Sequence, residues 1–490
     1  MSLLFDVENL SENKRECIAN LRVRIDKPKP WEFTSTVPQY MYPYRVTRAR
    51  DDRFAGRRQR EKKAAVPFAW GLSELEAKRP TRDRFTSIAF EFKGKLRQNQ
   101  KVIRKEAITN LNKRGSVIIS AYPGFGKTVT AINLVKKIGL KTIILVNKVV
   151  LMKQWIEAAK SFTTLKDDQI VKLSPPTKSQ RENPSKLTKW KNKLLRASLV
   201  IVNALNVPKM EDLFHDIGTV IVDECHQIMS KRMSEALLYL HPRYLIGLSA
   251  TPYRTDGLDA LLDLYFSKER LTRKLMKSHT VYEVTTGFKP LSELTEQGRL
   301  NWNVLLNSQS DDEKRNRMII DTAKKLKDRV ILILTKRVSQ AEYLEKTMEK
   351  EGVLVDGLYG SSSTFDKNCR VLVGTSSKIG VGFDHKRLDC LILASDVKEY
   401  FIQFLGRVFR SPKTEPIIID FVDSHPVLRK HFRSRKKVYI KHGGKIIKTT
   451  HLRLAQLKEI NLCAPISSSS RSAEPIEVDS YSDLKKSVNN

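Results

Sequence analysis

Short runs of β-branched and aliphatic residues recur along the chain from residue 96, and each is followed by a longer amphipathic stretch. Runs without polar alternation are typical of strands buried on both faces of a parallel sheet, and the stretches between them are typical of crossover helices. The pattern therefore predicts an α/β domain over residues 96–258. Its expected strands are Ser116–Ile119, Thr142–Val146, Leu199–Val202, Thr219–Val222 and Tyr244–Leu248.

The same rhythm returns later and predicts a second α/β domain over residues 312–450. Residues 259–311 are more polar and less regular, so we interpret them as a linker with some added structure. Residues 1–95 form an N-terminal accessory region without an assigned role, and the polar residues 451–490 are expected to be a disordered tail. The strands expected in the second domain are Val330–Leu334, Val371–Val373, Cys390–Leu393 and Ile417–Ile419.

The net charge of the chain indicates what kind of partner it binds. The chain has 89 Lys and Arg against 54 Asp and Glu, a net charge of +35. Such an excess favours a polyanionic partner, with nucleic acid as the leading candidate, because phosphate contacts release condensed counterions. A solvated lysine-rich surface is the alternative. The arginine-dense segment Arg45–Lys63 could be a phosphate-contacting arm, a nuclear address or a flexible charged linker.

The cysteines and the hydropathy of the chain indicate in which cellular compartment the protein functions. The five cysteines are scattered without a C-x-x-C pair, which argues against a disulfide framework or a zinc site and favours a reducing compartment. The first ten residues lack the basic and apolar parts of a signal peptide. No apolar run approaches the roughly 20 residues that span a bilayer. We expect an intracellular, soluble protein in the nucleus or cytoplasm, with the virion as the alternative if the protein is encoded by a virus.

A glycine-rich segment, AYPGFGKT at 121–128, stands between the first expected strand and a helix-like stretch. This is the context of a phosphate-binding loop, whose backbone N–H groups and helix N-terminus face the phosphates. Lys127 would reach the β- and γ-phosphates, and Thr128 would place its hydroxyl on Mg²⁺. The first position holds alanine where the general motif has glycine. The residues expected to bind ATP here are Ala121, Gly124, Phe125, Gly126, Lys127 and Thr128.

Another apolar run, TVIVDECH at 219–226, ends in two acids. Carboxylates at the carboxyl end of such a strand lie where α/β sheets bind ligands. Asp223 would hold Mg²⁺, mostly through water, and Glu224 would polarise the attacking water as a general base. The pair favours hydrolysis over phosphotransfer. The Cys–His dipeptide that follows could suggest a metal site, but no second cluster completes one, and His226 is expected to contact residues 249–251.

Taken together, these segments resemble the motifs of superfamily 2 helicases of the DExH type. The arrangement is similar to that of the TFIIH translocase subunit and of phage and large-DNA-virus helicases, a resemblance that Asp420–Pro426 strengthens. The resemblance covers roughly residues 96–445 and implies two RecA-like parallel-sheet domains in tandem. The segments that carry it, in chain order, are Ala121–Thr128, Asn147–Trp155, Asp223–His226, Ser249–Thr251, Gly374–Asp384 and Gln403–Arg410.

The last two segments supply the second half of an expected ATP site. Arg407 and Arg410 are three residues apart, so they would share one face of a helix. The resemblance implies that both act as arginine fingers on the γ-phosphate, with Gln403 nearby, whereas surface ion pairing is the alternative. It also implies that Gly382 and Asp384 contact the nucleotide sugar and the nucleic-acid backbone. ATP would then bridge the two domains.

The resemblance assigns further roles along the chain. Gln100 would read the adenine edge, for which its amide has a donor and an acceptor, although a polar patch at a helix start is the alternative. Trp155 could contact the strand or belong to the core. Residues expected to couple the domains are His226, Ser249, Ala250 and Thr251, and those expected to contact nucleic acid are Gln154 and Thr375.

The sequence therefore predicts an ATP- and Mg²⁺-dependent helicase or translocase that acts on nucleic acid, DNA more than RNA. An ATP-driven remodeller of transcription or replication and repair complexes is a second interpretation, and an RNA helicase is a third. A non-catalytic nucleic-acid-binding scaffold fits less well, because such a scaffold would be expected to have lost Lys127, Glu224 or the two arginines.

Overall fold

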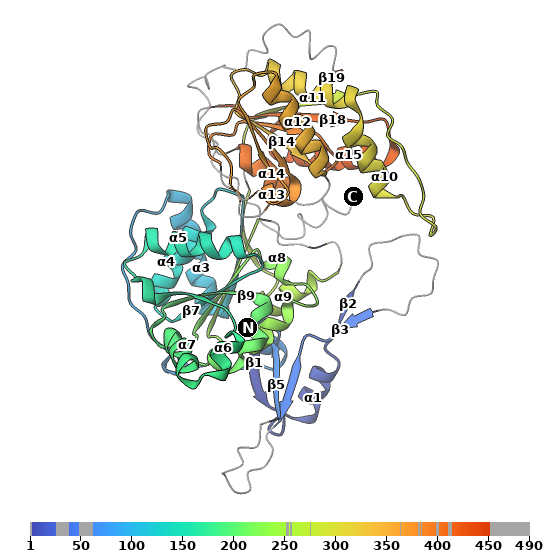
Figure 1. Ribbon diagram of the computed structural model, residues 1–490. Coiled ribbons are helices and arrows are strands. Elements are labelled where there is room, and N and C mark those ends of the chain that lie inside the picture. The colour runs from blue at the N-terminus through green and yellow to red at the C-terminus, as the bar shows by residue number, and fades with distance from the viewer. Residues whose placement is uncertain are drawn as a thin grey trace. The chain divides into compact units, whose positions relative to one another are not determined.

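The computed structural model describes residues 2–25, 39–48, 62–250, 254, 257–274, 276–362, 364–380, 383, 385–397, 401–409 and 414–450. These residues form two compact units that divide near residues 272 and 273. Each unit is built on a seven-stranded sheet (Figure 1). The prediction of two tandem α/β domains with an N-terminal region is confirmed.

The first sheet has the strand order β12-β6-β11-β10-β7-β9-β8. The neighbours from β6 to β8 all pair in parallel. Every strand expected from the sequence forms here, and β8 and β12 are added at the two edges. The bounds are β6 Ser116–Ala121, β7 Thr142–Val146, β8 Ile170–Leu173, β9 Leu199–Asn203, β10 Thr219–Asp223, β11 Tyr244–Ser249 and β12 Arg270–Arg273.

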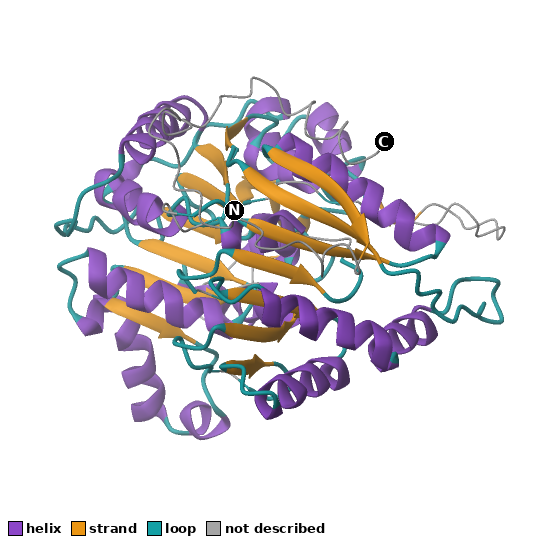
Figure 2. Cartoon of the chain, turned by 90° about the horizontal axis from the view of Figure 1, so that it is seen from above, coloured by secondary structure: helices purple, strands orange, loops and turns teal. Residues whose placement is uncertain are grey.

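Helices lie on both sides of the strands (Figure 2), as right-handed crossovers between parallel strands require. Gly115, which has a φ of 75°, ends the long helix α3 in a left-handed cap whose N–H donates to the carbonyl of Leu111. The helices of the first unit beyond residue 96 are α3 Gln98–Arg114, α4 Lys127–Ile138, α5 Val149–Phe162, α6 Lys178–Glu182, α7 Pro184–Arg196, α8 Cys225–Ile228 and α9 Ala260–Phe266, with 3₁₀ turns at Asp167–Gln169, Ala204–Leu213 and Ser234–Tyr239.

The N-terminal region packs on the first unit rather than standing apart from it. Leu3, Val66 and Phe68 belong to the same hydrophobic cluster as Leu237 and Phe266. The region contains an antiparallel sheet in the order β1-β5-β4 and a separate β2-β3 pair. Its elements are β1 Ser2–Asp6, α1 Glu12–Ala19, β2 Val23–Ile25, β3 Gln39–Met41, β4 Arg45–Arg48, β5 Lys62–Pro67, α2 Phe68–Glu74 and a 3₁₀ turn at Arg82–Arg84.

The second sheet has the order β15-β16-β14-β17-β18-β13-β19, with parallel pairing throughout. Its strands are β13 His279–Thr285, β14 Ile331–Thr335, β15 Val355–Leu358, β16 Val371–Thr375, β17 Cys390–Leu393, β18 Ile417–Val422 and β19 Gly444–Thr450. Its helices are α10 Trp302–Asp311, α11 Glu313–Lys325, α12 Val338–Lys350, α13 Ser376–Gly380, α14 Phe401–Val408 and α15 Pro426–Lys441.

The segment 259–311, expected to be a linker, contributes elements to both units. It supplies α9 and β12 to the first unit, and β13 and α10 to the second. β13 pairs in register with both β18 and β19. Its sequence, HTVYEVT, contains four polar residues and no continuous apolar run, so the pattern of buried parallel strands does not predict it.

Buried ion pairs hold two helices against the second sheet. Arg315 of α11 contacts Asp423 at 3.0 Å, and both side chains are at most 1% exposed. Arg435 of α15 contacts Asp420 at 2.8 Å and Asp396 at 2.9 Å. Removing one partner of such a pair typically costs about 3–5 kcal/mol, because an uncompensated charge is left buried. Arg435, one of several basic residues of α15, therefore has a structural role. Among the described residues, no helix is long and apolar enough to cross a bilayer.

Candidate active site

The glycine-rich loop and the acidic strand end lie at the same edge of the first sheet. β6 and β10 both pair in parallel with β11, which lies between them. Ser120 of β6 is opposite Ser249 of β11, and Asp223 of β10 is opposite Leu248. The carboxyl ends of the three strands therefore meet, as the sequence predicted for a ligand-binding edge.

The loop turns through two left-handed glycines. Gly124 has a φ of 86° and Gly126 a φ of 90°, which residues with a side chain rarely adopt. Phe125 between them is fully buried and anchors the loop in the unit. Lys127 begins α4, and its Nζ donates to the carbonyl oxygen of Ala121 at 2.8 Å. Thr128, in the first turn of α4, is partly exposed.

Gln100 supports this loop from the start of α3. Its Nε2 donates to the carbonyl oxygen of Phe125 at 2.9 Å, and its Oε1 accepts from the backbone N–H of Arg97 at 2.8 Å. The Arg97 guanidinium also donates to the Phe125 carbonyl. A Cβ at Gly126 would lie 2.3 Å from Gln100 Nε2, so only glycine fits there. Both polar atoms of Gln100 thus have partners within the chain, and adenine recognition by this residue stays a prediction.

Asp223 is a buried carboxylate with two donors. Its Oδ2 accepts from the indole N–H of Trp155 at 2.8 Å, and its Oδ1 accepts from the backbone N–H of Glu224 at 3.0 Å. Burial, followed by the neighbouring charge of Glu224, raises the pKa of Asp223 to about 6, although Trp155 and Lys127 act in the opposite direction. The side chain therefore favours a cation beside it.

Glu224 has an unusual backbone and a carboxylate oxygen without a donor. Its φ of 46° and ψ of 52° place a non-glycine residue in the left-handed region, and such strain clusters at functional sites. Among the described residues no group donates a hydrogen bond to its Oε2. The side chain is 16% exposed as a whole, whereas Oε2 itself is buried. These are properties of a general base.

His226 connects the acidic strand end to the end of the next strand. Its Nδ1 and Ser249 Oγ are hydrogen-bonded at 2.8 Å, and Nδ1 lies 3.5 Å from Glu224 Oε2. Burial, assisted by the charges of Arg254 and Lys127, lowers the pKa of His226 to about 3, so the ring is neutral near pH 7. Ala250, which follows β11, is half-buried, and Thr251 lies outside the described residues.

Trp155 is a site residue whose role the sequence left open. It is 1% exposed, so it is a core residue, yet its indole N–H points at the carboxylate of Asp223. Its neighbour Gln154, on the same helix α5, is half-buried. Trp155 precedes Asp223 by 68 residues, and no local pattern links the two positions, so only the folded structure could reveal the contact.

The second unit holds the remaining candidates that the structure describes. Gln403 and Arg407 lie on α14, and the Gln403 Nε2 is buried without a hydrogen-bond partner among the described residues. The Arg407 guanidinium donates to the carbonyl oxygens of Gly380 at 2.7 Å and Phe383 at 2.5 Å. Thr375 ends β16, is 4% exposed and shares a hydrogen bond with Ser377. The candidates Arg410, Gly382 and Asp384 lie outside the described residues.

A phosphate-binding loop beside a strand-end carboxylate pair, on one of two tandem parallel sheets, defines an ATPase with two RecA-like lobes. Residues 93–254 match the family model described as "Type III restriction enzyme, res subunit". The chain is 44% identical over 402 residues to "Putative helicase 161L" of Invertebrate iridescent virus 6, covering 78% of this chain and 88% of the relative. It is 35% identical over 402 residues to "Putative helicase 055L" of Frog virus 3, covering 79% and 86%.

The fold is also similar to that of S. cerevisiae Dbp5 bound to RNA and ADP BeF3. The TM-score is 0.50 at 12% identity, covering 79% of this chain and 94% of that one. The chain belongs to the family of superfamily 2 helicases that includes these two viral proteins. It is an ATP-hydrolysing helicase or translocase that binds nucleic acid, as the sequence predicted.

Proposed function

We propose that this chain moves along or unwinds DNA, driven by ATP that its first unit binds and hydrolyses. The observation that carries the proposal is Glu224, which has a strained backbone, follows the buried Asp223 and has one carboxylate oxygen without a hydrogen-bond donor among the described residues. DNA is favoured as the track because the motifs of the chain resemble those of the TFIIH translocase subunit and of phage and large-DNA-virus helicases. The net charge of +35 suits a phosphate backbone.

The residues of the first unit fit a bound Mg²⁺. Thr128 offers a hydroxyl oxygen and Asp223 a carboxylate oxygen, which are the hard ligands that this cation prefers. The raised pKa of Asp223, caused first by burial, means that a nearby positive charge would stabilise its ionised form. When bound, Mg²⁺ would neutralise charge on the β- and γ-phosphates. Lys127 and the loop N–H groups would hold those phosphates.

Glu224 would take the proton of the attacking water. The neutral His226, which is hydrogen-bonded to Ser249, would couple a change at Glu224 to the end of β11. Arg407 and Gln403 of the second unit, together with Arg410, are proposed to act on the γ-phosphate. Loss of that group would remove their partner and release one unit's hold on the strand. Such differential affinity is what movement requires.

Gln154 and Thr375 are proposed to contact the strand backbone. Gln154 is half-buried on α5. The Thr375 hydroxyl is already bonded to Ser377, so a contact there requires that this pair exchange partners. Gly382 and Asp384 remain proposed contacts of the nucleotide sugar, and Thr251 remains a proposed coupling residue.

The test is ATP turnover measured side by side with double-stranded DNA, single-stranded DNA and RNA of matched length. We expect DNA to stimulate turnover at least tenfold more than RNA does. Equal or greater stimulation by RNA would reject DNA as the track while leaving the ATPase intact. If none of the three nucleic acids stimulated ATP turnover, the proposal that the chain is a nucleic-acid motor would be rejected.

Replacing Trp155 by phenylalanine is expected to raise the Mg²⁺ concentration for half-maximal ATP turnover by about tenfold, as loss of a partner behind a metal ligand typically does. The reason is that Asp223 loses the indole donor that orients its carboxylate. Mg²⁺ titration of ATPase activity measures the shift.

The matched control is Trp190→Phe. Trp190 is also buried, and its indole donates to the Ser174 carbonyl at 3.2 Å, away from both acids. This variant should lose stability but keep its Mg²⁺ dependence. An equal shift in both variants would assign Trp155 a purely structural role.

A further inference from the structure

A cavity of the first unit lies at the amino-terminal ends of β6 and β11, whereas the phosphate-binding loop follows the carboxyl end of β6. It has a volume of about 640 Å³ and is lined by α2, the end of α3, the start of β6 and the residue before β11. β6 separates it from the loop by six residues, or about 20 Å of strand. The volume is within the range of small-ligand pockets, about 300–1,000 Å³. The N-terminal region, which the sequence left without a role, forms one wall through α2.

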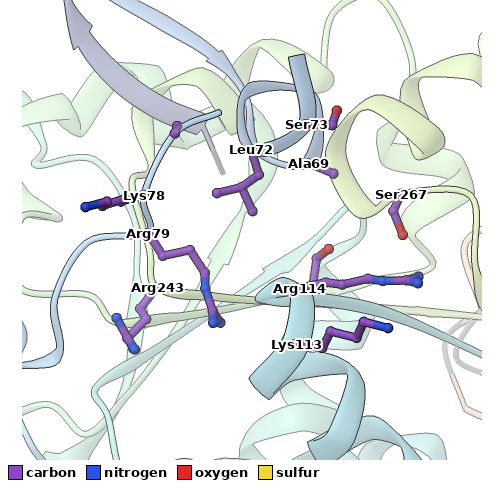
Figure 3. A pocket seen from close by; sticks show the side chains of 11 residues that line it. Ala69, Leu72, Ser73, Lys78, Arg79, Lys113, Arg114, Arg243 and Ser267 are labelled. Carbon is purple, nitrogen blue, oxygen red and sulfur yellow. The ribbon is translucent and has the colours of Figure 1, made fainter. Parts of the chain in front are cut away.

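The cavity is strongly basic. Its lining side chains include Lys78, Arg79, Lys113, Arg114 and Arg243, and none of the lining residues is acidic. Figure 3 shows Lys78, Arg79 and Arg243 on one side of the space, and Lys113 and Arg114 on the other. Glu269, outside the lining, pairs with Arg114, but the other four cations have no carboxylate partner in the lining and repel one another, so the arrangement favours a bound anion.

Two of these cations are fixed in place by neutral partners. Arg79 donates to the carbonyl oxygens of Leu111 and Asn112 at the end of α3, both at 2.7 Å. Arg243 donates to the carbonyl oxygen of Pro80 at 2.5 Å. Carbonyl oxygens orient a guanidinium but leave its unit charge uncompensated. A preorganised guanidinium is suited to phosphate recognition.

The same two guanidiniums converge on one aromatic ring. The Arg79 carbon Cζ lies 5.9 Å from the centroid of Tyr244, and that of Arg243 lies 5.5 Å from it. Burial, and then the charge of Arg243, lower the pKa of Arg79. Two like charges are thus held close together in a half-buried place, which an anion would relieve.

The other three cations differ in how they are paired. Arg114 forms an ion pair with Glu269. Lys78 and Lys113 are exposed, and among the described residues no carboxylate contacts either amine. These two lysines can turn toward a ligand without breaking an existing contact. They are therefore the best positions for testing the site without disturbing the fold.

We propose that this cavity is a second phosphate-binding site, which takes the phosphate groups of a small polyanion such as a nucleotide or an inorganic polyphosphate. Its place at the end of α3 matters, because Gln100 at the start of the same helix hydrogen-bonds the loop that binds ATP. A ligand in the cavity can thus influence nucleotide binding through one rigid element. The proposal does not depend on which nucleic acid the protein follows.

The test is calorimetric titration of the full chain with tripolyphosphate, in a Lys127→Ala background that removes competition from the ATP loop. We expect binding that weakens at least tenfold when Lys78 and Lys113 are both replaced by glutamate. The matched control is Lys105→Glu, an exposed position on the same helix outside the cavity. Equal affinity in the double variant and the control, or no binding in the parent, would overturn the proposal.

Thermal unfolding would reveal whether charge reversal disturbs folding. If it does, the neutral double variant Lys78→Gln with Lys113→Gln takes its place in the test. It also identifies the source of the phosphate. If a nucleic-acid backbone occupies the cavity, this pair should reduce the salt dependence of binding to a short single strand by about 1.4 in log–log slope, about 0.7 for each lost contact. An unchanged slope with weakened tripolyphosphate binding would assign the cavity to a small ligand. Unchanged affinity for tripolyphosphate in this pair would reject the site, whatever the ATPase assays show.

Discussion

Glu224→Gln is expected to bind ATP normally and to hydrolyse it at least about 100-fold more slowly, because an amide cannot accept the proton of the attacking water. The substitution keeps the size of the side chain and its position at the end of β10. The oxygen Oε2 of the wild-type carboxylate has no hydrogen-bond donor among the described residues and lies 3.5 Å from Nδ1 of the neutral His226, so the substitution removes no hydrogen bond at that oxygen. Steady-state turnover at saturating nucleic acid and a fluorescent-nucleotide titration measure the two properties separately.

The matched control is Glu157→Gln, which removes the same charge from an exposed position of α5 in the same unit. It should turn over ATP at the wild-type rate. Turnover within a few-fold of wild type in Glu224→Gln would mean that another group activates the water. Loss of ATP binding in that variant would instead mean that Glu224 acts in nucleotide affinity, and the base assignment would fail in that case also.

The strands that the sequence predicted share one physical property. β7, β10, β14 and β17 are buried on both faces, so their residues must be continuously apolar, and this pattern is visible without a structure. β13 and β19 contain charged residues that the fold accommodates locally. Glu283 of β13, for example, lies 3.5 Å from Lys436 of α15. Such pairs join residues far apart in the chain, so no local pattern reveals them.

The residues of the candidate site also fall into two groups, those that the sequence predicts and those whose contacts appear only in the folded chain. Residues whose role depends on backbone conformation, such as Gly126, or on the strand end, such as Asp223, are recognisable because their chemistry requires a fixed local spacing. The contact of Trp155 with Asp223 and that of Gln100 with Phe125 join separate elements, so they appear only in the folded chain. The basic cavity was hidden for the same reason, because its five cations come from three separate segments.

Arg407→Ala is expected to reduce the maximal rate of ATP hydrolysis by about 1,000-fold, the usual effect of removing an arginine finger. The affinity for ADP should change little, because the finger acts on the group that ADP lacks. Arginine is required because its guanidinium stays charged and can donate to two oxygens at once. Turnover at saturating ATP and ADP binding to the same preparation test both parts.

The structure also offers a competing role for Arg407, which gives this prediction its control. Its guanidinium donates to the carbonyl oxygens of Gly380 and Phe383, so it could act only by holding that loop. Arg387 makes a comparable contact, at 3.0 Å to the Lys367 carbonyl, in the same unit. Arg387→Ala should leave turnover unchanged. If Arg407→Ala lowers turnover less than tenfold, or weakens ADP and nucleic-acid binding together with the rate, Arg407 supports the loop and is not the finger. A loss confined to the rate would assign the Arg407 charge to the transition state.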